Sequence, residues 1–113
     1  MRTKIKQLFE KSSEYASKEV DIYGWVRTNR AQAQFGFLNV NDGSYFESLQ
    51  VVYDAALTNF SDISKYRVGV SVHVKGIVKL TPDMKQALEL HATEVLMLGD
   101  CPEDYPIQPK RHT

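Results

Sequence analysis

The sequence has very little cysteine and no excess of charge. A single cysteine, Cys101, stands among 113 residues, so no disulfide can form within the chain, which is typical of a reducing compartment. Lysine plus arginine and aspartate plus glutamate both number 14, so the formal net charge is zero. A protein that binds any polyanion usually carries a strong basic excess, which this chain lacks. The balance still allows a small basic groove that reads a few nucleotides.

Long apolar runs are also missing. The first residues contain no apolar core of the kind found in signal peptides, and no stretch approaches the length of a membrane span. These two absences predict a soluble, cytoplasmic protein that makes no contact with membranes. The length fits one domain with one hydrophobic core.

Motifs that carry catalysis or bind metals are absent as well. The three histidines, His73, His91 and His112, have no metal-ligand spacing with one another or with Cys101. We expect His73 and His91 to be surface or cross-strand residues. The sequence contains no nucleophile motif, no glycine-rich phosphate loop and no catalytic carboxylate pair. We therefore expect no catalytic residue, cofactor or metal within these residues.

What the chain does contain is the alternation of apolar and polar residues that is typical of half-buried strands. Five runs show it, and the polar segments 29–34, 41–48 and 81–86 connect some of them. The predicted strands are Val20–Thr28, Phe35–Asn41, Leu49–Tyr53, Val70–Leu80 and Ala87–Met97. Gly24 inside the first run predicts a bend or bulge.

Two helices are predicted outside these runs. Residues 4–16 place Ile5, Leu8, Phe9 and Tyr15 at helical spacing. A shorter helix is expected over Ser61–Tyr66, with Ser61 capping its start.

The order of elements predicts the fold. A helix, three strands, a short helix and two strands match the OB-fold, an all-β Greek-key barrel of five strands, here expected to be antiparallel. We expect this domain to span residues 1–98. Residues 99–113 carry three of the four prolines and are interpreted as a linker. We also expect the natural protein to continue past Thr113.

The outward face of the second and third strands is the candidate binding site. If Leu38 and Val40 face the core, then Phe35, Phe37, Asn39 and Asn41 face outward, and Gln50 shares that face. Aromatic rings beside amides suit stacking on bases and reading their edges. Two alternatives remain open: a generic module for single-stranded nucleic acid, and a protein-interaction domain in which a partner covers the two phenylalanines.

Several short motifs occur in a specific order. Gly24-Trp25-Val26-Arg27 comes first, Asn41-Asp42-Gly43-Ser44 follows the second strand, and Leu49-Gln50-Val51-Val52 forms the third. With these motifs, the chain resembles the N-terminal anticodon-binding domain of class IIb aminoacyl-tRNA synthetases, the aspartyl, asparaginyl and lysyl enzymes. The segment 41–44 is most similar to the asparaginyl member, with the aspartyl member as the nearest rival. The end of the chain, from Tyr105-Pro106 to Thr113, is similar to the phrase that leads into the catalytic domain.

The resemblance implies roles for four residues. Arg30, Phe37 and Gln50 match the family positions that hold the middle anticodon base, a uridine. Glu89 matches, by register, a glutamate that contacts the first anticodon base in the aspartyl relatives. The lysine that the family often has near Ala33 is missing. The resemblance further implies that the partner is the anticodon loop of tRNA(Asn). It also implies that the parent enzyme is a homodimer that uses ATP and Mg2+ in a catalytic domain beyond Thr113.

Overall fold

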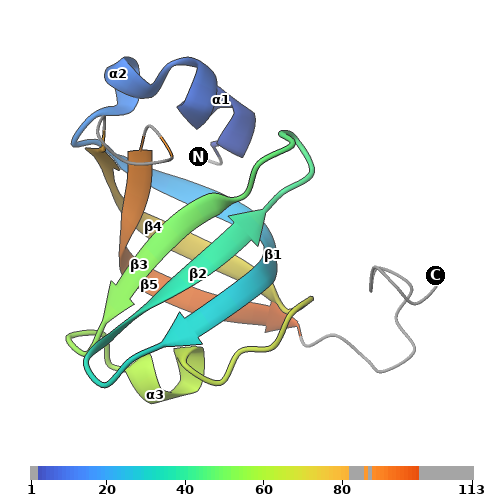
Figure 1. Ribbon diagram of the computed structural model, residues 1–113, viewed down its shortest axis with the longest axis vertical. Coiled ribbons are helices and arrows are strands. Elements are labelled where there is room, and N and C mark those ends of the chain that lie inside the picture. The colour runs from blue at the N-terminus through green and yellow to red at the C-terminus, as the bar shows by residue number, and fades with distance from the viewer. Residues whose placement is uncertain (1–2, 82–85, 87, 100–113) are drawn as a thin grey trace.

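Five strands close into a barrel in the order β1-β2-β3-β5-β4 (Figure 1). The structure, a computed structural model, describes residues 3–81, 86 and 88–99. The strands are β1 (Glu19–Ala31), β2 (Phe35–Asn41), β3 (Leu49–Asp54), β4 (Ser71–Leu80) and β5 (Leu88–Gly99). This arrangement confirms the predicted OB-fold barrel. The pairing is antiparallel except between β3 and β5, which run parallel and so depart from the antiparallel expectation.

The core forms because one face of each strand is apolar. In β4 every second residue from Val72 to Val78 is buried, Gly76 included. In β2 the prediction is confirmed that Leu38 and Val40 face the core. Asn41 was expected to face outward, and this is wrong. Its side chain is buried because it bonds the following connection, with Oδ1 accepting from the Gly43 N–H at 2.7 Å.

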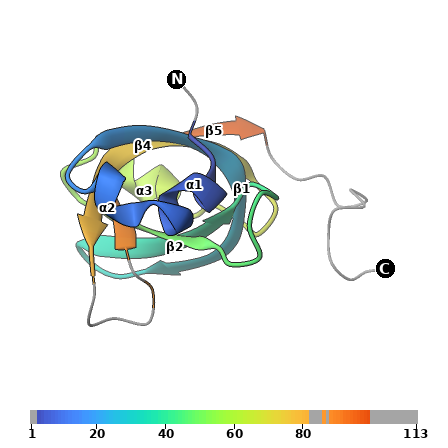
Figure 2. The ribbon, with the colours of Figure 1, turned by 90° about the horizontal axis from the view of Figure 1, so that it is seen from above.

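The first predicted helix forms as two short ones. They are α1 (Ile5–Glu10) and α2 (Ser12–Tyr15), separated at Lys11, whose backbone leaves the helical region. Figure 2, which looks down on the barrel from above, shows α1 and α2 lying across the barrel opening. Ile5 and Leu8 are fully buried, so α1 closes this end of the core.

The helix at the opposite end, α3 (Phe60–Ile63), is shorter than predicted (Figure 1). The expected span Ser61–Tyr66 and the cap at Ser61 are both wrong, because Asn59 occupies the N-cap position. The Asn59 side chain does not cap the helix either; it donates to the Val95 carbonyl at 2.7 Å. It therefore ties α3 to β5 across the bottom of the barrel.

The connection between β2 and β3 caps α1 from a distance. Asp42 Oδ2 accepts from the Ile5 N–H at 3.0 Å, and Ser44 Oγ accepts from the Lys6 N–H at 3.1 Å. The first N–H groups of a helix have no partner within the helix, so these two bonds satisfy them. Gly43 lies between them at φ +82, a conformation that glycine adopts without strain. The Asn-Asp-Gly-Ser motif thus caps the start of α1.

A bulge in β1 decides which side chains face outward at its end. Val26 pairs with Val40 and Thr28 with Asn39, so Arg27 is an extra residue in β1. The bulge was expected at Gly24; instead a Cβ at Gly24 would collide with the Asn41 backbone, so glycine permits close approach there. Because a strand alternates faces, the extra residue puts Arg30 outward, although Val26 at the same parity is buried.

The strand extends further than predicted at this end. Residues 29–31 belong to β1, so the expected loop 29–34 contracts to 32–34. Most of the predicted connection 81–86 and the segment from 100 onward lie outside the described residues, and with them the predicted linker and Cys101. Within the part that is described, no helix has the length and apolarity that crossing a membrane requires.

Candidate nucleic-acid interface

A row of four side chains crosses the outer face of the barrel. Arg30 of β1 pairs with Phe37 of β2, Phe37 with Val52 of β3, and Val52 with His91 of β5. A second row lies beside it, two residues along the strands, because the pair in between, Leu38 and Val51, faces the core. It runs through Thr28, Asn39 and Gln50 to Glu89. We call Arg30, Phe37, Gln50, Glu89 and His91 the outer strip.

The first half of the outer strip is an aromatic platform. The Arg30 guanidinium carbon lies 5.3 Å from the centre of the Phe37 ring, which is a cation–π contact. Phe35 meets Phe37 edge to face with ring centroids 5.4 Å apart. Phe35 is 41% exposed, and Phe37 is partly exposed. A flat ring beside a cation suits stacking on a nucleobase.

The second half is a chain of hydrogen bonds. Gln50 Nε2 donates to Glu89 Oε2 at 3.1 Å, and Glu89 Oε1 lies 2.8 Å from His91 Nε2. The Glu89 side chain is 18% exposed and the His91 side chain 44%, so the chain is open to solvent at the histidine. Amide and carboxylate groups of this kind can exchange hydrogen bonds with the edges of bases.

The structure brings together the four residues that the sequence singled out. They form two contacting pairs, Arg30 with Phe37 and Gln50 with Glu89. Their assignment as anticodon-binding residues stays a prediction. His91 belongs to the same strip, although the sequence offered no role for it. The signal was present: His91 has the parity of Glu89 in a strand, so both had to share a face.

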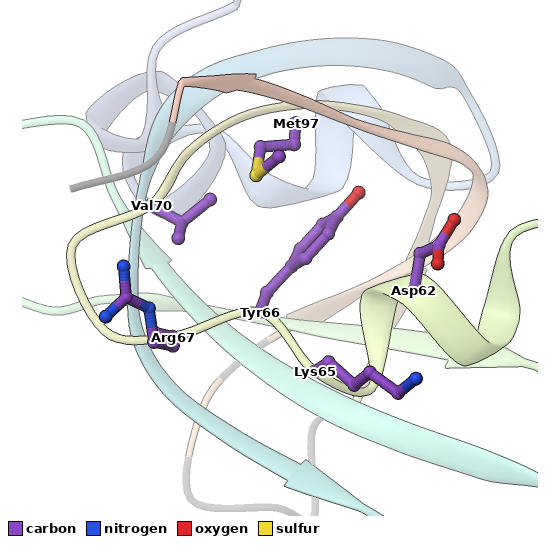
Figure 3. A pocket seen from close by; sticks show the side chains of 6 residues that line it. All are labelled: Asp62, Lys65, Tyr66, Arg67, Val70 and Met97. Atoms are coloured by element: carbon purple, nitrogen blue, oxygen red, sulfur yellow. The ribbon is translucent and has the colours of Figure 1, made fainter. Parts of the chain in front are cut away.

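A separate hollow lies at the opposite end of β5 from Glu89. Its volume is about 310 Å³, and Figure 3 shows the side chains of α3, the following turn and Met97 around it. Burial and the nearby Asp62 charge raise the pKa of Tyr66, with burial the larger cause. No member of the outer strip lines this hollow. Across the described ranges, no group of three or more His, Cys, Asp or Glu side chains could hold a metal ion.

Comparison with known families gives the class of the protein. Residues 20–98 match the model of the OB-fold nucleic acid binding domain of the tRNA anticodon type. This match covers well over half of the chain. The chain therefore belongs to this family of nucleic-acid-binding domains.

Individual relatives are more specific. The chain is 50% identical over 109 residues to the asparagine–tRNA ligase of Clostridium novyi, covering 96% of the chain and 24% of the relative. The chain thus spans about a quarter of the length of the curated relatives it matches.

Solved structures share the fold. Asparaginyl-tRNA synthetase from Pyrococcus horikoshii, complexed with asparaginyl-adenylate, superposes with a TM-score of 0.77 at 24% identity. The match covers 98% of this chain and 26% of that one. Aspartyl-tRNA synthetase from Entamoeba histolytica gives a TM-score of 0.77 at 21% identity, over 94% and 23% of the two chains.

Proposed function

We propose that this domain binds the anticodon loop of tRNA(Asn) as the N-terminal part of an asparagine–tRNA ligase. The observation that carries the proposal is the outer strip, in which a stacking ring, a cation, an amide and a carboxylate lie on one open face of an OB-fold barrel. The relatives are named asparagine–tRNA ligases and are about half identical to the chain over nearly its whole length. Their names support asparagine as the amino acid that the parent enzyme attaches. Recognition is the contribution of this domain, and catalysis belongs to the rest of the enzyme.

Each residue has a physical role in this proposal. Phe37 stacks on the middle anticodon base, a contact worth about 1–3 kcal/mol per base. Gln50 offers a donor and an acceptor to the uracil edge. Arg30 donates to a base carbonyl or to a phosphate, because its guanidinium is always charged. Glu89 accepts hydrogen bonds from the first anticodon base.

The parent enzyme extends the proposal beyond this chain. It attaches asparagine to tRNA(Asn) with ATP and Mg2+, both held by the catalytic domain, and it acts in the cytoplasm as a homodimer. The net charge of zero fits this reading better than a generic binder, since affinity would come from a few specific contacts and not from a wide basic surface.

The test is a titration of the 113-residue chain with two anticodon stem-loops at one fixed salt concentration. The loops are identical except for uridine or cytidine at the middle position. We expect a preference for uridine, and we expect Phe37→Ala and Gln50→Ala to weaken binding while the fold stays intact. Phe46→Ala is the matched control, because Phe46 is 82% exposed and lies outside the outer strip.

Other outcomes would select a different function. Equal binding of both loops, with a steep dependence on salt, would identify a generic single-strand-binding module. Equal binding by wild type and both variants would refute the site. A preference for an aspartate anticodon over an asparagine anticodon would assign the domain to an aspartyl enzyme.

A further inference from the structure

Glu89 is held at both carboxylate oxygens by neighbours on the same face. Oε2 accepts from Gln50 Nε2 at 3.1 Å, and Oε1 is 2.8 Å from His91 Nε2. A free glutamate side chain has three rotatable bonds and samples many rotamers, so binding through it costs conformational entropy. Two anchors, one on each oxygen, remove most of that freedom before any ligand arrives.

The anchors come from two different strands. Gln50 is on β3, beside β5, and His91 is two residues along β5 from Glu89 itself. The strand backbone fixes this spacing, because residues two apart lie on the same face. Strand β4 packs against the edge of β5 opposite to β3. A Cβ at Gly76 of β4 would collide with the His91 backbone, so glycine lets β4 approach β5 closely at this point.

An anchored carboxylate can still accept further hydrogen bonds. An ionised carboxylate offers about four lone-pair sites, and its two neighbours use two of them. For His91 to hold Glu89 in this way, Nε2 carries the proton and donates it. The remaining sites suit a base edge with two adjacent N–H donors, which guanine has and adenine lacks.

We infer that His91 is a positioning residue for base recognition, which holds Glu89 in the orientation that selects a guanine-type donor edge at the first anticodon position. This inference rests on the proposed function. It assigns to His91 an effect on selectivity between bases and no direct contact with the base that is read. The ligand is a nucleotide adjacent to the one stacked on Phe37, and the edge of its base carries two neighbouring N–H donors.

The chain contains its own control. His73 Nε2 lies 2.8 Å from Asp21 Oδ1, the same separation as in the His91–Glu89 pair. His73 sits on β4 across from Tyr23 of β1, and the two rings stack with centroids 4.2 Å apart. This second pair lies outside the outer strip. Removing His73 therefore deletes the same kind of contact without touching Glu89.

The experiment uses stem-loops with uridine fixed in the middle and guanosine or adenosine at the first anticodon position. We expect wild type to prefer guanosine by about tenfold, the size of discrimination by a good paired contact to a base edge. His91→Ala should lower this preference by about two- to tenfold, the range that goes with re-ordering one mobile side chain on binding. His91→Gln, which keeps a donor at the same reach, should restore most of it.

A double-variant test separates positioning from a general loss of affinity. Glu89→Gln should abolish the guanosine preference, and His91→Ala added to it should change the preference no further. His73→Ala should leave the preference as in wild type. The uridine-over-cytidine preference at the middle position should survive all of these changes, because it depends on Phe37 and Gln50.

Each contrary result has a distinct meaning. If wild type selects uridine in the middle but shows no first-base preference, or if His91→Ala keeps the full guanosine preference, the inference is wrong while the proposed function stands. The inference is also wrong if the effects of His91→Ala and Glu89→Gln on selectivity simply add. If wild type shows no middle-base preference, the proposed function fails and the inference fails with it.

Discussion

The two faces of β2 and β3 differ in what their side chains contact. On the inner face Leu38, Val40 and Val51 are fully buried among other apolar side chains. On the outer face Phe37 and Gln50 alternate with them, remain partly exposed, and contact charged residues of neighbouring strands. The same strands thus carry the stability of the barrel on one side and the proposed recognition on the other. Substitutions on each face should therefore affect different measurements.

The largest effect is expected on the inner face. Leu38→Ala removes a fully buried side chain and leaves a cavity, which should lower the free energy of unfolding by about 2–5 kcal/mol. Denaturant unfolding would measure it. Phe46→Ala serves as the comparison, because an exposed loop side chain should change stability by no more than about 0.5 kcal/mol. A loss for Leu38→Ala as small as that of Phe46→Ala would contradict the comparison.

A smaller effect is expected where the β2–β3 connection meets α1. Asp42→Ala leaves the Ile5 N–H without its partner at a part-buried site and also removes the acceptor for Ser44. Losing a helix cap costs about 0.5–2 kcal/mol. Asp42→Asn keeps one acceptor oxygen and should recover part of the loss in the same unfolding measurement. Unchanged selectivity between anticodon loops would place this motif on the structural side of the comparison.

The sequence predicted the barrel because its pattern is local and repeated. Alternation in β2 and β4 assigns Leu38 and Val74 to the core without knowledge of their neighbours, and both are buried. It also put Phe35, Phe37 and Gln50 on one outer face. The short helix was harder: Asn59 has the residue type of a cap, but its side chain bonds β5, a contact between distant parts of the chain.

Features set by tertiary contacts could not be predicted. The bulge at Arg27 has no mark in the sequence, because arginine is common in any exposed strand, yet it turns Arg30 outward. The pattern likewise assigned Asn41 outward, since alternation alone does not reveal a hydrogen bond to the following turn. The link between Glu89 and His91 required the face and the distance together. Resemblance to a family supplied the predicted roles of four residues, and geometry added the proposed role of His91.

A smaller effect on the free energy of unfolding is expected from the contact between Arg30 and Phe37. A cation–π pair at a partly exposed site contributes about 0.5–1 kcal/mol. Arg30→Ala, Phe37→Leu and the double variant form a cycle whose coupling energy, measured by unfolding, should fall in that range. Arg30→Lys should keep the charge but lose part of the coupling, because a planar guanidinium stacks better on a ring. A coupling near zero would mean that the platform is assembled only when a base is bound.

The smallest effect on stability is expected outside β2 and β3, at the Asp21–His73 pair of β1 and β4. The hydrogen bond from His73 is the largest cause that lowers the pKa of Asp21 below its ordinary value of 3.8. Burial opposes this shift, and the charge of Lys75 adds to it.

A carboxyl group with a lowered pKa in the folded state stabilises the fold above its unfolded pKa. That contribution is lost as the pH falls through the folded value. The stability difference between wild type and Asp21→Asn should therefore shrink in acid, as the pH falls below about 4. Urea midpoints measured for both proteins across this range would show it. A difference that grows below about pH 4 would reverse the sign and remove Asp21 as a stabilising anion. Binding to the anticodon loop should be the same for both proteins near neutral pH, since this histidine pair lies outside the outer strip.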